Sequence, residues 1–268
     1  MIRQLRLVLF TGIALLYVVS PAHALPTLWE TEIGVPLTQL TGEDDNEQTV
    51  ALDFAFPLFD STYTDISVSV NGVVSLFMAY HLPYAMKEMS AFMGTPMIAP
   101  FWTDLSLVLM GNVYFNNLDD RAVITWAEVG SFHAPMTPFS FQVQLLSDGG
   151  IIFGYNGIPD TTTALDEHLI VGVSTGHMTG VVDAYDYSIV NEVELRGTAY
   201  ELFEIGGTGF DLDNSNISFM PFVDPEPPQS PPSAAPIPEP GSFVLLSVAI
   251  IGFIGYISKR SEKGKVSR

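Results

Sequence analysis

The clearest catalytic motif in this chain is Gly172-Val173-Ser174-Thr175-Gly176. It matches G-x-S-x-G, in which a nucleophilic serine sits on a sharp turn between a strand and a helix. The residues before Ser174 predict a strand, but His177 to Gly180 predicts a turn and Val181-Val182 begins another apolar segment. A nucleophile elbow needs a helix at that point. We therefore predict that Ser174 belongs to a strand and that no catalytic residue is present.

Metal-binding patterns are weak in this chain. Four histidines stand apart, without the paired spacing of a zinc site: His81, His133, His168 and His177. We therefore predict no zinc site and no tightly held cofactor.

The turn that begins at Asp211 starts like a calcium loop, because Asp211, Asp213 and Asn214 offer oxygen ligands. Asn216 stands where an EF-hand requires glycine, however, and Phe222 stands where it requires an acid. A loosely bound Ca²⁺ is the weaker alternative to a turn without metal. The acidic residues 43–47 most simply form a solvated loop.

Methionines and aromatic residues crowd the segment from residue 78 to residue 97. Thioether clusters can bind Cu(I), but methionine more often fills irregular apolar gaps and makes adaptable contact surfaces. Exposed apolar loops are usually contact sites. We therefore predict an interaction loop with these contact residues: Tyr84, Met86, Met89, Phe92 and Met93.

Charge separates the body of the chain from its two ends. Residues 25–240 hold three basic residues against 29 acidic ones, a net charge of −26, whereas both ends are basic. Such a body repels phosphate backbones, so nucleic acid is excluded as a partner. The chain has no cysteine, so the folded part must be stable without disulfides.

The body of the chain predicts many short strands punctuated by Gly, Pro, Asn and Asp. Residues 50–56 alternate as a half-buried strand that ends at Pro57. Asn71-Gly72 supplies the left-handed positions of a two-residue hairpin turn, and Asp148-Gly149-Gly150 predicts a second hairpin turn. Only residues 81–93 could form a helix. The predicted fold is all-β, an antiparallel β-sandwich-like domain over residues 25–220.

This series of short motifs resembles the nidogen-like (NIDO) extracellular domain. The matching segments lie between residues 45 and 176: 54–59, 70–75, 98–104, 111–115, 124–126, 141–143 and 148–156. The resemblance implies a non-enzymatic domain of the adhesion class, and it supplies no catalytic residue. The cysteines of animal members are missing, so no particular partner is implied.

Residues 221–240 contain nine prolines, a composition that favours extended polyproline and cannot bury a core. We predict a stalk at residues 221–237. An apolar segment follows at residues 243–257, of which ten are Phe, Val, Leu or Ile. Its insertion into a bilayer is favoured by roughly 3–6 kcal/mol. Lys259 and Arg260 then act as a membrane stop, with further basic residues behind them.

Pro238-Glu239-Pro240, the apolar helix and the basic cluster together resemble the PEP-CTERM sorting signal, over residues 238–268. The resemblance implies recognition by an exosortase-like membrane protease in a Gram-negative bacterium. It also implies delivery to the cell surface or extracellular matrix, after a transient stay in the inner membrane. An ordinary tail anchor or stop-transfer helix is the alternative.

The N-terminal segment predicts export. Arg3 and Arg6 precede an apolar stretch, and Ala22-His23-Ala24 has the small, alternating pattern after which signal peptidase cuts. Residues 7–19 are too few for a comfortable membrane span, which disfavours an N-terminal anchor. We predict a signal peptide at residues 1–24 with cleavage after Ala24.

Two classes of function follow from these patterns. The first is a non-enzymatic surface or matrix protein that contributes to adhesion, biofilm or an exopolysaccharide matrix, with exopolysaccharide or surface proteins as partners. The second is a secreted hydrolase that acts on polysaccharide or peptide with a pair of carboxylates about 5–9.5 Å apart. A cleft that holds such a pair would favour the hydrolase.

Overall fold

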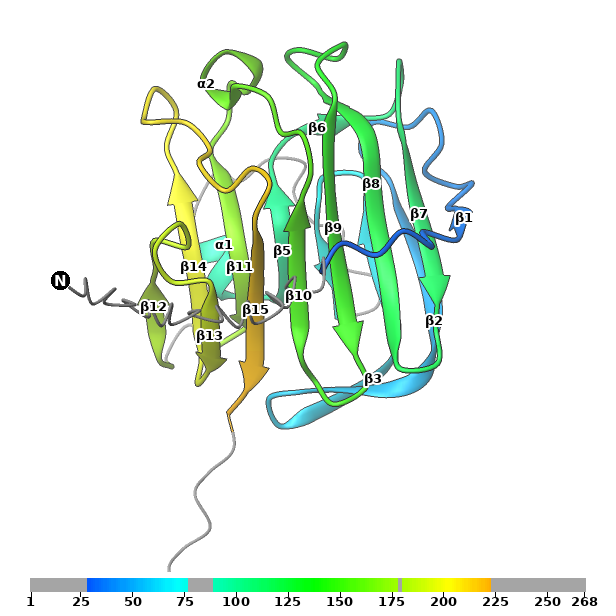
Figure 1. Ribbon diagram of the computed structural model, residues 1–268, viewed down its shortest axis with the longest axis vertical. Coiled ribbons are helices and arrows are strands. Elements are labelled where there is room, and N and C mark those ends of the chain that lie inside the picture. The colour runs from blue at the N-terminus through cyan, green and yellow to red at the C-terminus, as the bar shows by residue number, and fades with distance from the viewer. Residues whose placement is uncertain (1–27, 77–88, 178–179, 223–268) are drawn as a thin grey trace, which may run out of the picture. The chain divides into compact units, whose positions relative to one another are not determined.

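Alternating apolar residues build two β-sheets, which pack face to face in the computed structural model (Figure 1). The structure describes residues 28–76, 89–177 and 180–222. The predicted signal peptide, most of the methionine-rich loop, the stalk and the sorting segment lie outside these residues. None of the described helices is long and apolar enough to cross a bilayer.

Sheet A has a continuous path of seven strands and one strand beside it. Its order is β1 (Val35–Pro36), β7 (Asn112–Asn117), β8 (Arg121–Ser131), β9 (Phe139–Leu146), β10 (Ile151–Tyr155), β15 (Asn216–Pro221) and β13 (Glu192–Leu195), with β6 (Leu105–Ser106) paired to β8.

Sheet B contains the remaining strands. Its order is β12 (Val182–Ala184), β14 (Thr198–Phe203), β11 (Leu169–Thr175), β5 (Pro96–Trp102), β4 (Val74–Ser75), β3 (Ser61–Ser69) and β2 (Glu47–Leu58). The two described helices are short, α1 (Met89–Met93) and α2 (Thr161–Ala164). The all-β sandwich prediction is therefore confirmed.

Two pairings correct the expectation of a purely antiparallel sandwich. β12 pairs with β14 in parallel, and β13 pairs with β15 in parallel. The chain from β12 to β13 passes from the edge of sheet B to the edge of sheet A. The paired strands are not joined by a hairpin turn, so no turn motif in the sequence predicts these pairings.

Both predicted hairpins are present, but the expected two-residue turn at Asn71-Gly72 is a three-residue loop, residues 70–72, in which only the glycine has a positive φ. Gly72 has a φ of 71°, and the amide of Ser69 donates to the carbonyl oxygen of Val73 across the turn. A Cβ atom on Gly72 would lie 2.0 Å from the carbonyl oxygen of Phe101, so close backbone packing also requires glycine here. Gly149, with a φ of 92°, turns β9 into β10.

The strand that was expected to end at Pro57 continues beyond it. Pro57 pairs with Thr62 inside β2, which is the last strand of sheet B. Proline is tolerated on an edge strand because its missing N–H group faces no further strand. The edge position, which only the fold reveals, explains the error.

The core between the sheets is built around stacked aromatic rings. Trp126 stacks on Phe141 with ring centroids 4.9 Å apart, and Phe141 stacks on Phe101 at the same distance. All three side chains are fully buried. Phe101 belongs to sheet B and the other two belong to sheet A, so the stack joins the sheets.

The outer faces of the two sheets are covered differently. Residues 28–34, which we call the N-terminal strap, hydrogen-bond to outward side chains of sheet A, and in Figure 1 this segment crosses in front of β9 and β8. On the outer side of sheet B, Phe92 of α1 packs with Trp102 and Ile170 in a second, smaller apolar cluster.

Candidate functional site

Ser174 lies inside β11 and is fully buried. Its hydroxyl accepts a hydrogen bond of 3.1 Å from the amide of Gly176. The described residues that follow, 176–177 and 180–184, form no helix. The structure confirms that Ser174 is a strand residue, and a buried hydroxyl cannot reach a substrate.

The carboxylate of Asp213 has a structural use. Its Oδ1 atom accepts hydrogen bonds from the amides of Gly157 and Ile158, at 2.9 and 2.8 Å, and its Oδ2 atom accepts one from Asn214 at 2.7 Å. These bonds fasten the turn before β15 to the loop after β10. No group of three or more His, Asp or Glu side chains among the described residues is arranged to hold a metal ion. The loosely bound calcium ion therefore stays a prediction.

The predicted interaction loop is described only at its end. Met89 and Met93 are partly buried against the outer cluster of sheet B, and Phe92 is fully buried in it. The expected exposure of Phe92 is thus corrected: the ring packs 6.4 Å from Trp102, because an apolar sheet face needs a cover. Tyr84 and Met86 lie outside the described residues.

Hydrogen bonds tie several loops together at one end of the sandwich, the end at the top of Figure 1. The amide of Leu105 donates to Asn71, whose own side-chain amide donates to Asp45. The amide of Phe132 donates to the carbonyl oxygen of Asp104 at 3.0 Å. The hydroxyl of Ser131 donates to the carbonyl oxygen of Ala164 at the end of α2. Together these bonds hold the loops at this end in place.

Acidic side chains gather at this end. Burial raises the pKa of Asp104 to about 7, and repulsion from neighbouring carboxylates adds to the effect. Those neighbours come from two other loops: Asp45, Asp44, Asp166 and Glu167. His133 Nδ1 lies 3.4 Å from Asp166 Oδ2, both at the surface.

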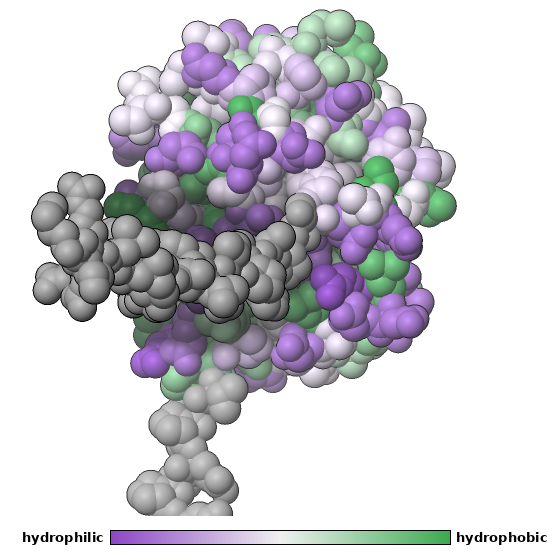
Figure 2. Space-filling model, in the orientation of Figure 1, coloured by the Kyte–Doolittle hydropathy of each residue, from purple (hydrophilic) through white to green (hydrophobic). Residues whose placement is uncertain are grey.

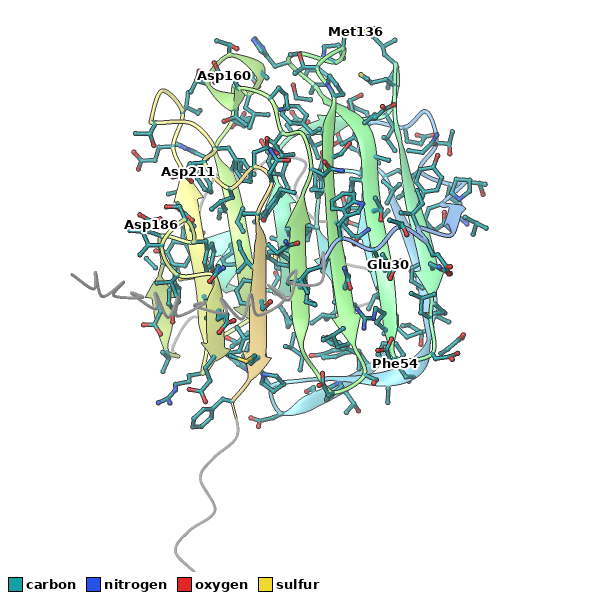
Figure 3. All side chains as sticks on the ribbon, viewed as in Figure 1. Glu30, Phe54, Met136, Asp160, Asp186 and Asp211 are labelled. Atoms are coloured by element: carbon teal, nitrogen blue, oxygen red, sulfur yellow. The ribbon has the colours of Figure 1, made fainter. Side chains whose placement is uncertain are left out.

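Large apolar side chains are exposed beside these acids. They belong to the loop after β6 and to the loop after β8, two strands that pair with each other: Val108, Leu109, Phe132 and Met136. Met136 is 71% exposed, and Figure 3 labels it at the tip of this end. In Figure 2 green, hydrophobic residues appear here next to purple, hydrophilic ones. We call these four residues with Asp104, Asp166 and Glu167 the loop-end surface.

No periodic pattern in the sequence marks the loop-end surface. Its apolar residues lie in two loops that are separated in the chain, the β6–β7 loop and the β8–β9 loop, and only the folded sandwich places both loops at the end shown at the top of Figure 1. The short polar and proline-containing segments around Phe132 and Met136 predict a loop, but not which side chains it exposes.

A second acidic region surrounds Glu201 of β14. Burial raises the pKa of Glu201 to about 7, and Asp211 and Asp186 raise it further, whereas the hydrogen bond from the Tyr187 amide lowers it. A pocket of about 380 Å³ lies here, lined in part by these three acids and Glu204. Figure 3 shows Asp186 and Asp211 at this side of the sandwich.

Comparison with known proteins agrees with this β-architecture. The chain is similar to alpha-tectorin of Mus musculus, with 23% identity over 181 residues, which are 67% of this chain but only 8% of the relative. No solved structure matches significantly. A model of the family described as NIDO related matches residues 22–205, well over half of the chain. The chain therefore belongs to the NIDO-related family.

Proposed function

We propose that this protein is an exported, non-enzymatic interaction protein whose contacts are made by the loop-end surface. The observation that carries the proposal is that surface itself: four large apolar side chains exposed beside a cluster of acids. Large apolar side chains exposed in loops at one end of a soluble domain are typical of contact sites. Membership of the NIDO-related family supports a role in binding rather than catalysis.

The partner that fits this surface is a protein with basic and apolar side chains. Asp166 and Glu167 offer negative charge, and Phe132 and Met136 offer apolar anchors. Charge complementarity would steer a basic partner to the surface, and burial of the apolar anchors would hold it there.

Export and sorting complete the proposal. Signal peptidase would cut after Ala24, and an exosortase-like protease would process the chain at Pro238, Glu239 and Pro240 while Lys259 and Arg260 hold the C-terminus on the cytoplasmic side. The product would reach the cell surface or matrix and contribute to adhesion or biofilm. Phe222, where the described chain ends, follows β15 at the end opposite the loop-end surface (Figure 1).

A secreted hydrolase is the second candidate, and Glu201 is the observation that favours it. A carboxyl with a pKa of about 7 beside a pocket that contains other acids is suited to general acid catalysis. The hydrogen bond from Tyr187 gives Glu201 a structural use as well, since it anchors the turn between β12 and β13.

The loop-end surface can be tested by the double substitution Leu109→Asp and Phe132→Asp in the exported protein. We expect loss of retention at the cell surface with an unchanged melting temperature, because both side chains are exposed. The matched control is Val35→Asp with Ile189→Asp, which alters exposed apolar residues elsewhere. Unchanged retention in the first variant would contradict the proposal. Hydrolysis of polysaccharide or peptide by the parent that is lost in Glu201→Gln would favour the hydrolase.

A further inference from the structure

An uncharged pocket lies on the outer side of sheet A, where β10 and β15 are neighbours. It measures about 210 Å³, and six residues line it: Trp29, Tyr155, Asn156, Asn214, Ser215 and Asn216. None of these side chains carries a charge at neutral pH, although the whole chain has a net charge of −20. The loop-end surface contributes no residue to this pocket.

The N-terminal strap places Trp29 in this pocket. The amide of Glu30 donates to Gln142 at 2.9 Å, and the side-chain amide of Gln142 donates back to the carbonyl oxygen of Glu30 at 3.0 Å. Gln144 donates to the carbonyl oxygen of Leu28. Trp29 is therefore held between two fastened residues, and Figure 3 shows Glu30 on the strap in front of sheet A.

Gly154 makes room for the indole ring. It pairs with Asn216, and since Phe153 and Ile217 point into the core, both face outward. A Cβ atom on Gly154 would lie 3.2 Å from Trp29 Cε3 and 3.2 Å from Asn216 Oδ1. The glycine thus brings the ring and the amide together on one patch of the sheet.

The amide groups of this pocket remain open to a ligand. Asn156 is exposed and Asn216 is partly exposed, and both line the pocket, so their side-chain amides are accessible to a ligand. Asn214 uses its Nδ2 atom to donate to Asp213, which leaves its Oδ1 atom as an acceptor. Tyr155 points inward and donates its hydroxyl hydrogen to Pro100, so it contributes its backbone.

We propose that this pocket binds a neutral sugar ring. A pyranose has an apolar face of C–H groups that packs on an indole, and hydroxyl groups that both donate and accept. Asparagine amides also donate and accept, so they match hydroxyl groups without charge. A charged ligand would find no opposite charge here, and an anionic polysaccharide would be repelled by the acidic body.

The size of the pocket fits one ring. Pockets for drug-sized ligands measure about 300–1,000 Å³, and this one is smaller. The affinity for a free monosaccharide should be weak, with a Kd on the order of 1 mM. The inference deepens the proposed function and rests on its extracellular location, where polysaccharide is available as a partner.

Trp29 itself reports binding. The chain has three tryptophans, and Trp102 and Trp126 are fully buried. The probes are methyl α-D-glucopyranoside, methyl α-D-mannopyranoside, methyl β-D-galactopyranoside and N-acetylglucosamine, added to the protein as exporting cells produce it. We expect at least one to change the tryptophan fluorescence in a saturable way, and alginate, an anionic polymer, to leave it unchanged.

Substitutions locate the site, with binding followed by ligand-observed NMR. Trp29→Ala should weaken binding more than tenfold, and Asn156→Ala should weaken it about two- to tenfold, as expected for one neutral hydrogen bond. Asn156 is exposed and outside the core, so its variant should fold normally. Ile189→Ala, which truncates an exposed apolar side chain outside both the pocket and the loop-end surface, is the matched control and should bind the sugar as tightly as the parent does.

The outcomes separate this inference from the proposed function. No saturable response to any neutral sugar, or unchanged binding by both Trp29→Ala and Asn156→Ala, would overturn the sugar site and leave the exported role in place. Sugar binding by a protein that stays in the cytoplasm would support the pocket but contradict the proposed function.

Discussion

The indole Nε1 of Trp126 donates a hydrogen bond of 3.0 Å to the carbonyl oxygen of Ser69. Trp126 belongs to β8 of sheet A and Ser69 ends β3 of sheet B, so this bond crosses the interior of the sandwich. Without disulfides, the two sheets are held together by such contacts and by the aromatic stack around them.

Trp126→Phe and Trp126→Ala should both destabilise the fold, and the alanine variant should be the less stable of the two. The phenylalanine variant keeps a ring against Phe141 but loses the hydrogen bond, and we expect a loss of about 1–3 kcal/mol in the free energy of unfolding. The alanine variant also leaves a cavity, at a cost of about 3–5 kcal/mol. Denaturant titration measures both; equal stability of Trp126→Phe and the parent would show that the bond between the sheets is unimportant.

Gly72→Ala tests the close backbone approach at the first hairpin. Gly206→Ala is a matched control, because Gly72 and Gly206 have φ values of 71° and 73° but no atom lies within 4 Å of a Cβ on Gly206. The control should cost about 1–2 kcal/mol through backbone strain. Gly72→Ala should cost about 1–3 kcal/mol more, since its Cβ meets the carbonyl oxygen of Phe101. Similar melting temperatures for the two variants would contradict the packing described for this turn.

Phe92→Ala should lower the stability by about 3–5 kcal/mol, because the ring is buried between Trp102 and Tyr200. Phe132→Ala removes the same group from a site that is 58% exposed, and it should change the stability by less than about 0.5 kcal/mol. The difference in melting temperature checks this. If Phe92→Ala had the same melting temperature as the parent but was no longer retained at the cell surface, Phe92 would be a contact residue.

The raised pKa of Asp104 predicts that the free energy of unfolding falls as the pH rises from about 4 to 7. The pKa of its carboxyl is about 7 in the folded protein, against an ordinary value of 3.8 for an aspartate. The folded state therefore binds more protons than the unfolded state in this window, which makes the slope of stability against pH negative. Asp104→Asn should remove this contribution and stabilise the protein at pH 8, on the order of 1 kcal/mol after allowance for solvent screening.

Asp119→Asn is the control for this measurement, since Asp119 is exposed on a turn at the other end of the sandwich. Thermal melts at several pH values compare the variants. A parallel pH profile for Asp104→Asn and the parent would show that the acids around Asp104 do not repel one another appreciably.

Local signals explain why the fold class could be predicted. Gly72 and Gly149 allow the turns at Asn71-Gly72 and Asp148-Gly149 through positive φ values that few other residues adopt, and alternation of apolar residues marks the strands. The parallel pairing of β13 with β15 and the crossing of the N-terminal strap depend on segments far apart in sequence. No short motif encodes those contacts.

The candidate sites were harder to predict than the fold. Met136 and Leu109 lie in two separate loops, which only the folded sandwich places at the same end, and Trp29 lines a pocket with Asn156 and Asn216 only when the strap crosses sheet A. Phe92 shows the reverse error, because an apolar residue in a loop-like segment looks like a contact residue until the sheet face beneath it is known.

The most direct test of the exported role is intact mass spectrometry of the protein from separated cell fractions, with and without a functioning exosortase. We predict a species outside the cell that begins at Leu25 and ends near Pro238, and its accumulation in the inner membrane with the C-terminal segment intact when the protease is absent. A full-length chain that remains in the cytosol and retains residues 1–24 and 238–268 would contradict the account.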